Sequence, residues 1–310
     1  WHWRYVSPLD TAMPLRPTQR ERENLWKLLE MARSEDLGSG DVTSAILPRD
    51  VQARGHFRAR QPMVFCGGEL LETIAVCYDG SLRTKTPLDE GARVEPGAVL
   101  AEWHGPARAM MSAERVALNF LQRLSGVATT TAEYVDAVKG TDAEIYDTRK
   151  TTPGWRDLEK YAVRAGGGQN HRKGLWDAVL IKDNHLAVLA RAEGLDPIES
   201  AARELERVRP YLGERSFMEL EVDSMEQFDV ALTLPVDIIL LDNMSSDELA
   251  EAVERRRRAG LAEHIELEAS GGITLQNVRE VAERGVDRIA IGALTHSAGA
   301  VDIALDIEIE

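Results

Sequence analysis

The chain has 310 residues, of which 44% are hydrophobic and 29% charged, and its formal net charge is −15. This composition is typical of a soluble globular protein with room for a large α/β domain and a smaller one. No run reaches the ~18 apolar residues that cross a bilayer, and the first ten residues lack the layout of a signal peptide, so we expect a cytoplasmic protein without a membrane partner. Two cysteines, Cys66 and Cys77, are too few for a disulfide scaffold or a thiolate metal cluster, and we expect them to pack in the core.

The N-terminal third predicts a helix, then short strands, then a long helix. Apolar residues recur at helical spacing between residues 15 and 35, with Thr18 as the expected N-cap. From Val51 to Trp103 short apolar runs alternate with turn formers, which indicates strands and tight turns around one helix at residues 69–76. A long helical pattern then starts at Ser112, its expected N-cap, and joins the two halves of the chain.

From Ala143 onward the pattern is strand, loop and helix, repeated six times. Buried β-branched strands alternating with amphipathic helices predict an α/β fold with a parallel sheet covered by helices. Six units are fewer than the eight of a complete barrel, and no glycine-rich turn follows the first strand, so an incomplete (β/α) barrel fits better than a doubly wound sheet. The expected strands are 144–146, 178–181, 218–222, 238–241, 265–268 and 288–291, and the expected helices include 196–209, 246–259 and 275–284.

The ends of these helices carry further signals. Gly260 and Gly285 follow two of them as C-terminal glycines. Arg255 to Arg258 lie in a last helical turn, where the helix dipole favours cations, so we interpret them as a solvated helix end and not as a binding site. The final residues, VDIALDIEIE, alternate apolar and polar side chains and predict a strand that returns to the smaller domain.

Residues 147–184 form a positively charged segment in an acidic chain. We call it the cationic segment; its lysines and arginines outnumber its acidic residues. The rest of the molecule would repel a polyanion, so this segment excludes nucleic acid and indicates a small, highly charged anion. Its cations are Arg149, Lys150, Arg156, Lys160, Arg164, Arg172, Lys173 and Lys182.

A charged, polar or glycine position stands at or just beyond the end of each expected strand. The carboxyl ends of parallel barrel strands converge where active sites form, so we expect these residues to share one site. They are Arg149 and Lys150, Lys182, Glu221, Asp242, Ser270 with Gly271 and Gly272, and Gly292.

Two glycine-containing loops suit a phosphate group. Ser270–Gly272 precedes a helix expected near Thr274, so its backbone N–H groups could hold an anion, and Ile291, Gly292 and Ala293 could supply more. Turn geometry alone would also explain these glycines.

The remaining site residues leave alternatives open. Glu221 and Asp242 suit a shared Mg²⁺ or ribose hydroxyls, or they could pair with Lys150 and Lys182. Lys182 follows an apolar strand, where Schiff-base chemistry is possible. The three donors that suit planar carboxylates are Arg149, His171 and Arg172.

His171 could instead be a core or helix-capping histidine, and the other histidines show no zinc spacing. The residues thus indicate a phosphorylated sugar beside a carboxylate-bearing anion. Phosphoribosyl transfer and a Schiff-base aldol reaction both satisfy this description, and a non-catalytic phosphosugar sensor is a third class.

Several motifs, in order, resemble those of the quinolinate phosphoribosyltransferase family. In the second half these are DTRKTTPG, GGGQNHR, IKDNH, ELEVDS, LLDN, EASGGI and GALTHS. EDLGSGDVTS, VEPGAVL and GPARAMMSAERVALNFLQRLSG are similar to the N-terminal half of that family. The resemblance covers the chain from about residue 30 to residue 303.

The resemblance implies an open α/β sandwich over residues 1–125, joined by residues 295–310, and an incomplete barrel over residues 126–294. It implies transfer of the phosphoribosyl group of phosphoribosyl pyrophosphate to quinolinate with Mg²⁺ and loss of CO₂, giving nicotinate mononucleotide and pyrophosphate for NAD synthesis. A paralogue that uses nicotinate is the nearest alternative. It also implies a homodimer or larger homo-oligomer with active sites at subunit interfaces.

Matching positions imply the roles of single residues. Lys150 and Lys182 would be catalytic and would face the substrate anions with Thr148, Arg149, His171 and Arg172, and Glu221 and Asp242 would face ribose and metal. Ser270–Gly272 and Ile291–Ala293 would bind the 5′-phosphate. Arg115 is similar to an arginine that the family lends to the neighbouring subunit's site.

Overall fold

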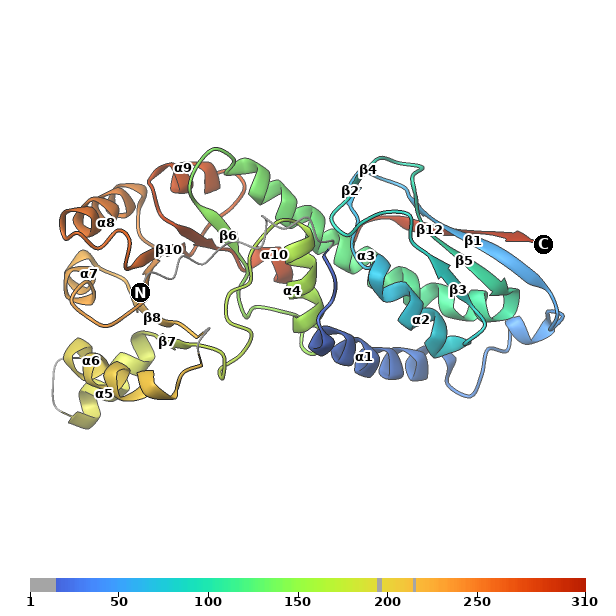
Figure 1. Ribbon diagram of the computed structural model, residues 1–310, viewed down its shortest axis with the longest axis horizontal. Helices are drawn as coiled ribbons and strands as arrows, with labels where there is room; N and C mark the ends of the chain where they lie inside the picture. The colour runs from blue at the N-terminus through green and yellow to red at the C-terminus, as the bar shows by residue number, and fades with distance from the viewer. Residues whose placement is uncertain (1–14, 194–196, 214–215) are drawn as a thin grey trace. The chain divides into compact units, whose positions relative to one another are not determined.

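The computed structural model describes residues 15–193, 197–213 and 216–310, so the first ten residues, in which we looked for a signal peptide, lie outside it. The chain forms two compact units (Figure 1). The first comprises Trp1–Ala128 with Ala300–Glu310, and the second comprises Thr129–Gly299. The domain boundaries expected at residues 125 and 295 lie a few residues from these divisions. None of the helices in the described ranges is long and apolar enough to span a membrane.

Helix α1, Gln19–Leu37, begins at the predicted N-cap. The Thr18 hydroxyl accepts a hydrogen bond from the Glu21 amide at 3.3 Å, and the Glu21 carboxylate accepts one from the Thr18 amide at 2.7 Å. This capping box satisfies two amides that the first helical turn leaves unpaired, and such caps contribute about 1 kcal/mol. Leu25 and Leu29 bury the apolar face that the sequence pattern marked, so this helix is confirmed.

The first unit is built on an antiparallel sheet with the order β12-β1-β5-β3. The C-terminal strand β12 pairs with β1 from Ala53 to Ala59, which confirms the returning strand that the alternating tail predicted. The rings of Phe57 and Trp103 pack in a T-shaped arrangement in the core of this unit, with their centroids 4.9 Å apart. The strands are β1 Gln52–Ala59, β3 Arg83–Lys85, β5 Val99–Pro106 and β12 Ile303–Ile309, with a separate pair β2 Met63–Val64 and β4 Arg93–Val94.

Short helices complete this unit. The helix expected at residues 69–76 is present as a 3-10 turn, Gly68–Leu70, followed by α2, Leu71–Tyr78, and another 3-10 turn covers Ser44–Ile46. Cys66 is buried as expected, Cys77 is half-buried, and both are free thiols. Burial raises the pKa of Cys77, which agrees with a packing role.

Helix α3, Ala107–Ala137, follows strand β5 directly, so the prediction that Ser112 caps it was wrong. Ser112 lies inside the helix, and its hydroxyl donates to Asp41 Oδ2 at 2.6 Å. The helix extends further back because Met110 packs on the sheet: a Cβ at Gly55 would lie 2.7 Å from Met110 Sδ. Tertiary packing therefore sets this helix start.

The second unit holds six parallel strands in the order β6-β11-β10-β9-β8-β7, which confirms the incomplete barrel. Tyr146 also makes an isolated parallel bridge to Gln169. Within the described ranges β6 and β7 are the two edges of the sheet, so the barrel stays open between its first and second strands. The strands are β6 Glu144–Tyr146, β7 Val179–Ile181, β8 Met218–Val222, β9 Ile238–Asp242, β10 Glu266–Ser270 and β11 Arg288–Ala290.

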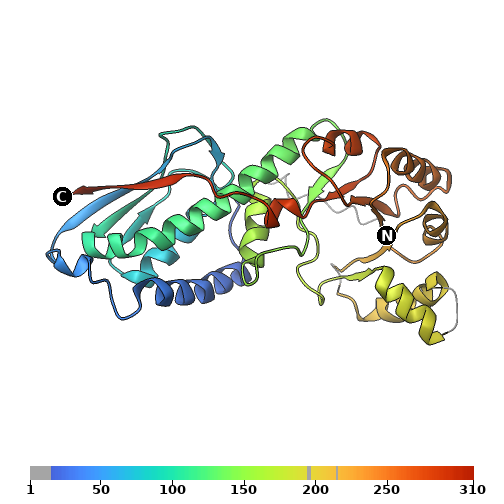
Figure 2. The same cartoon turned by 180° about the vertical axis from the view of Figure 1, so that it is seen from behind.

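Helices α5 to α9 follow one another around the outside of this sheet (Figures 1 and 2). The helix expected at residues 196–209 is α6, Pro197–Val208, and Asp196 lies outside the described residues. Four helices within the described ranges were not predicted by position: α4 Arg156–Ala165, α5 Asp183–Glu193, α7 Met225–Ala231 and α10 Ala293–His296. The helices expected at residues 246–259 and 275–284 are α8 Ser246–Arg258 and α9 Val278–Glu283, and a 3-10 turn covers Arg209–Tyr211.

The four arginines at the end of α8 are not all solvated, so that interpretation was wrong for Arg256. Its side chain is buried, donates to the Ile265 carbonyl at 2.8 Å and pairs with Asp287. Asp287 also accepts from the Leu267 amide at 2.7 Å. Arg256 therefore ties the end of α8 to the start of β10, which a charge pattern on one helix does not reveal.

Candidate functional site

The predicted site residues follow strands that end in register. Ser270 lies opposite Asp242 on one side and opposite Ala290 on the other, and Ala290 lies opposite Tyr146. The loops after β6, β9, β10 and β11 therefore all leave the sheet at the carboxyl-terminal ends of its strands. These loops carry Lys150, Asn243, Gly271 and Gly292. The alternation of strands and helices in the sequence predicts parallel strands, and their parallel register brings these positions together.

Glu221 and Asp242 line a pocket of about 70 Å³ at the carboxyl-terminal ends of the strands, together with Leu186 and Gln227. The Lys182 ammonium pairs with Glu221, so the alternative of a carboxylate–lysine pair is realised here. Asp242 accepts a hydrogen bond from the Asn243 side chain at 2.7 Å. The two carboxylates thus face a small space with oxygen donors that suit a hard divalent cation or hydroxyl groups.

The loop after β10 requires glycine at position 271. Gly271 has φ +93°, and a Cβ there would lie 2.1 Å from Asn243 Oδ1. Asn243 itself has φ 54°, and its amide donates to the Ser270 carbonyl at 2.9 Å. The helix expected near Thr274 begins later, at Val278, because Asn277 Oδ1 accepts from the Thr274 amide at 2.7 Å and holds a turn.

The loop after β11 lies against the loop after β6. A Cβ at Gly292 would lie 2.8 Å from Lys150 Cδ and 3.1 Å from His296 Cδ2. The Thr295 hydroxyl donates to the Lys150 carbonyl at 2.8 Å. The Ile291 amide donates to the Tyr146 carbonyl at 2.9 Å, so the sheet already uses that amide. Lys150 and Gly292 are therefore direct neighbours, and the exposed His296 joins them.

Arg149 and Arg172 form a pair of like charges. Arg172 is buried, and its guanidinium donates to the Ala178 carbonyl at 3.2 Å. Burial first, and the positive charge of Arg149 second, lower the pKa of Arg172. Arg149 Nε is buried and finds no hydrogen-bond partner among the described residues. Two guanidinium groups whose positive charges act on each other, one of them with an unused buried donor, would be stabilised by an anion.

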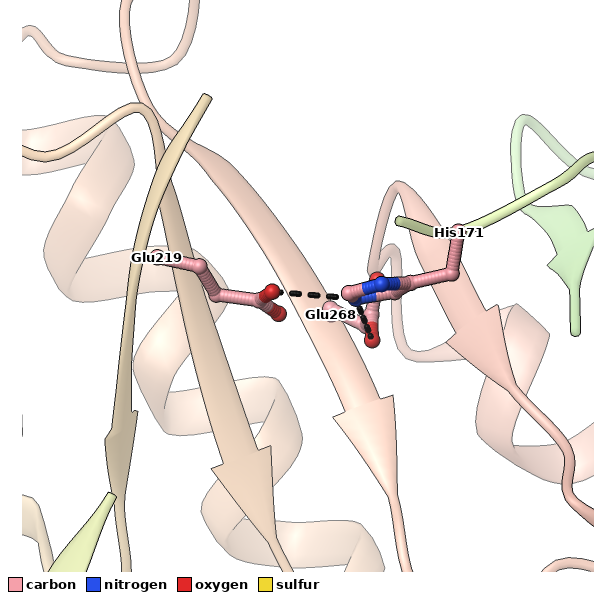
Figure 3. Close-up of side chains that lie close together, drawn as sticks. All are labelled: His171, Glu219 and Glu268. Carbon is pink, nitrogen blue, oxygen red and sulfur yellow. Dashed lines mark ion pairs between the residues drawn. The ribbon is translucent and has the colours of Figure 1, made fainter. Parts of the chain in front are cut away.

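His171 is buried, with its Nε2 2.9 Å from Glu219 Oε2 and 3.4 Å from Glu268 Oε1 (Figure 3). Burial lowers the pKa of His171, but the facing carboxylates of Glu268 and Glu219 outweigh burial and raise it to about 9. The Arg172 amide opposes this shift, because it donates to Nδ1 at 2.7 Å and a second proton would displace it. Nε2 thus lies within ion-pair distance of both carboxylates and closer to that of Glu219.

Lys160 and Arg156 belong to the interior of the cationic segment. Lys160 is buried, pairs with Asp147 and donates to the His171 carbonyl at 2.9 Å. Arg156 donates to the Thr151 hydroxyl at 3.0 Å and to the Lys173 carbonyl at 3.2 Å. These two cations hold the backbone of the segment, so fewer of its charges are available to a ligand than the sequence suggested.

Thr148 lies in the loop after β6, whereas Arg115 lies in the first unit. The Thr148 hydroxyl accepts from the Lys150 amide at 3.0 Å and so shapes the loop after β6. Arg115 is an exposed residue of α3 in the first unit, whereas the other predicted site residues lie in the second.

Sequence reasoning missed the buried ions beneath the site, Glu219, Glu268 and Arg288. Glu219 and Glu268 stand two residues before Glu221 and Ser270, so strand alternation places each pair on one face of the sheet. Charged residues two positions apart within otherwise apolar strands were the sequence signal that could have identified these buried carboxylates. Asn243 and His296 were also missed, and only their contacts with Gly271 and Gly292 reveal them.

Two family models and several known proteins match this chain. The model of the quinolinate phosphoribosyl transferase C-terminal domain matches residues 127–306, and that of the N-terminal domain matches residues 41–125. The nicotinate-nucleotide pyrophosphorylase [carboxylating] of Mycobacterium leprae is 42% identical over 284 residues, 90% of this chain and 95% of that protein. A probable enzyme of the same name from Bacillus subtilis is 39% identical over 284 residues, 91% of this chain and 93% of that protein.

Solved structures show the same similarity. The nicotinate-nucleotide pyrophosphorylase from Francisella tularensis has a TM-score of 0.83 and 30% sequence identity, over 96% of this chain and 100% of that one. Both domain models and these relatives cover almost the whole described chain. The chain belongs to the quinolinate phosphoribosyltransferase family.

Proposed function

We propose that this protein transfers the phosphoribosyl group of phosphoribosyl pyrophosphate to quinolinate with loss of CO₂, which yields nicotinate mononucleotide and pyrophosphate for de novo NAD synthesis. The observation that carries this proposal is the Arg149–Arg172 pair. Two guanidinium groups whose charges act on each other, one of them with a buried Nε that has no partner among the described residues, suit two adjacent carboxylates. Family membership supplies the reaction in which such a ligand is consumed.

The residues at the strand ends divide between the two substrates. Arg149 and Arg172 would hold the carboxylates of quinolinate. The loop Ser270–Gly272, with the neighbouring Gly292 and Ala293, would receive the 5′-phosphate of the donor through backbone amides. Lys150, which lies against Gly292, and Lys182, beside Glu221, would face the pyrophosphate.

Glu221 and Asp242 fit the Mg²⁺ that the family reaction uses. Their carboxylate oxygens line one pocket, and oxygen donors are what Mg²⁺ prefers. When bound there, Mg²⁺ would offset the negative charge of the pyrophosphate. The Lys182 ammonium that now pairs with Glu221 would then be free to contact a substrate anion.

The chemistry follows from these positions. The C1–O bond to pyrophosphate breaks through an oxocarbenium-like state, and the cations around the leaving group stabilise the charge that collects on it. The pyridine nitrogen of quinolinate then forms the new bond to C1 from the opposite face. The ring nitrogen becomes positive, so the bond to the adjacent carboxylate breaks with its electrons left on C2, CO₂ departs, and C2 takes up a proton.

We also propose that the protein is cytoplasmic and acts as a homodimer or larger homo-oligomer in which Arg115 reaches the neighbouring subunit's site. Arg115 is exposed, and no hydrogen bond or ion pair engages it within the part of the chain that the structure describes. It stands on α3 three residues after Ser112, whose bond to Asp41 fixes the loop beside this helix. An exposed arginine without a partner among the described residues suits a ligand that another copy of the chain supplies.

The Schiff-base alternative has less support. The Lys182 side chain already pairs with Glu221, so its nitrogen is not free to attack a carbonyl group. Borohydride added with a phosphosugar aldehyde should leave Lys182 unlabelled. Labelling of Lys182 would favour the lyase over the transferase.

Calorimetric titration tests the proposed ligand. We expect quinolinate to bind at least roughly tenfold more tightly than nicotinate, because the second carboxylate adds charge-assisted hydrogen bonds to the arginine pair. Arg149→Met and Arg172→Met should each remove that preference, whereas Arg279→Met, which changes an exposed arginine of α9 paired with Glu283, should keep it. Equal affinity of the unchanged protein for both pyridines would contradict the assignment.

A further inference from the structure

We infer that Glu219 is a positioning residue: with Glu268 and Arg288 it forms a buried charged layer beneath the site that fixes the His171 ring and, through this ring, the backbone of Arg172. We call these three residues the buried layer. The inference rests on the proposed function only in that it takes quinolinate as the ligand of Arg172.

The buried layer lies on the same face of the strands as the site, one level deeper. Glu219 precedes Glu221 by two residues on β8, and Glu268 precedes Ser270 by two on β10, so each pair points to the same side of the sheet. The side chains of Glu219 and Glu268 are 0% exposed. Both carboxylates therefore lie within the barrel and out of reach of solvent.

Arg288 balances only part of the charge in this layer. Its Nε lies 2.9 Å from Glu268 Oε2, and its guanidinium stacks 3.9 Å from the centre of the Tyr146 ring. Two buried carboxylates beside one guanidinium leave one carboxylate to be satisfied, and a buried carboxylate without a partner is costly. The His171 imidazole faces that carboxylate as an ion-pair partner, with Nε2 2.9 Å from Glu219 Oε2.

The imidazole of His171 and the carboxylates of Glu219 and Glu268 are close enough together to surround a metal ion. Arg288 argues against this, because it already pairs with Glu268 and would repel a cation beside it. An imidazole held by a carboxylate fits the contacts better than a metal centre.

His171 is fixed at four points, and this makes it a rigid link. Its amide donates to Asp147 Oδ1 at 2.9 Å, and its carbonyl accepts from the buried Lys160 at 2.9 Å. Its Nε2 faces Glu219, while its Nδ1 accepts the Arg172 amide at 2.7 Å. Loss of the Glu219 carboxylate would let the ring turn over, which puts the carbon Cδ2 in the place of Nδ1, and the Arg172 amide would then lose its acceptor.

This link predicts a selective kinetic effect. In Glu219→Ala the KM for quinolinate should rise roughly tenfold, the size of one lost hydrogen bond to a charged group, while the KM for phosphoribosyl pyrophosphate stays within about twofold. Glu219→Gln keeps an oxygen acceptor for Nε2 and should recover part of the quinolinate affinity. It also keeps the side-chain volume, so it serves as the test should the alanine variant not fold.

Glu266→Gln is the matched control. Glu266 lies on the same strand as Glu268 and pairs with the same Arg288 at 3.2 Å, but its side chain is 51% exposed and is not among the groups that face His171. The control should leave both KM values unchanged. Equal rises in both KM values in Glu219→Ala, or no rise at all, would overturn the positioning role, since general loosening of the barrel would affect both substrates.

A second readout does not depend on the proposed reaction. ¹⁵N spectra of histidine-labelled protein, recorded above the pKa of about 9 so that the ring is neutral, should show one tautomer of His171 with the proton on Nε2. The signal, assigned with His171→Gln, should become a mixture of tautomers in Glu219→Ala. A mixture already present in the unchanged protein would overturn the inference. If the spectra behave as expected but quinolinate is not turned over, the proposed function fails and the positioning role stands.

Discussion

Lys160 and Asp147 form an ion pair inside the second unit, with 1% and 0% of their side chains exposed. Asp147 also accepts from the His171 amide, and Lys160 donates to the His171 carbonyl. The residue beside Arg172 is thus held on both sides of its backbone by one buried pair. Lys160 therefore stabilises the fold, although it belongs to the cationic segment. Only the other cations of this segment are available to bind a ligand.

Lys160→Met should destabilise the protein by about 3–5 kcal/mol, because it leaves the buried Asp147 carboxylate without its cation. Urea unfolding followed by circular dichroism measures this change. Lys139→Met is the control, since Lys139 is 70% exposed and pairs with Asp136 on the surface, and it should cost less than about 0.5 kcal/mol. Equal stability of the two variants would contradict a structural role for Lys160.

Gly271→Ala should weaken the binding of phosphoribosyl pyrophosphate by at least roughly tenfold, because a Cβ 2.1 Å from Asn243 Oδ1 displaces the loop in addition to straining its backbone. The KM for the donor measures the effect. Gly260→Ala carries the strain alone, since Gly260 has φ +73° and nothing within 4 Å of its Cβ position. It should lower stability by about 1 kcal/mol and leave the KM unchanged. A normal donor KM in Gly271→Ala would remove the loop from the site.

The loop that follows β10 shows what a sequence can and cannot predict. The glycines after β10 and the register of the parallel strands follow from local patterns, so the strand ends that carry Glu221, Asp242 and Ser270 could be placed in advance. The contact of Asn243 with Gly271 could not, because it joins two loops that are far apart along the chain.

Burial was the main property that the sequence concealed. Lys160 and Arg256 were interpreted as surface or ligand-facing cations, and both are buried against carboxylates from other elements. Ser112 was expected to begin a helix, but packing of Met110 on the sheet extends that helix to Ala107. In each case a tertiary contact overrides a local preference, whereas Thr18, whose capping partners are local, was predicted correctly.

Asp41 should contribute stability that depends on pH. The hydroxyl of Ser112 and then that of Ser44 donate to its carboxylate and lower its pKa from 3.8 to about 2. A lowered folded pKa means that the contribution is fully present above about pH 4 and is lost as the pH falls towards 2. The melting temperature of Asp41→Asn should therefore lie below that of the unchanged protein at pH 6, and the two should converge near pH 2. A constant difference across this range would contradict the account.

Mixing an Arg115→Ala variant with a Lys150→Ala variant should restore part of the turnover that each lacks. A hybrid dimer would contain one site with both its own Lys150 and an Arg115 from the partner, so about half the sites of each hybrid are complete. Recovery of activity over time after mixing, at constant total protein, measures this. Absence of recovery despite demonstrated subunit exchange would show that Arg115 acts within its own subunit or not at all.

Turnover of quinolinate with release of CO₂ tests the central claim most directly. The protein, phosphoribosyl pyrophosphate, Mg²⁺ and quinolinate labelled at the 2-carboxylate are incubated together, and labelled CO₂ and nicotinate mononucleotide are counted. The account predicts one CO₂ for each mononucleotide, and no mononucleotide when nicotinate replaces quinolinate. Mononucleotide formed from nicotinate without CO₂, or donor bound but not consumed, would contradict it.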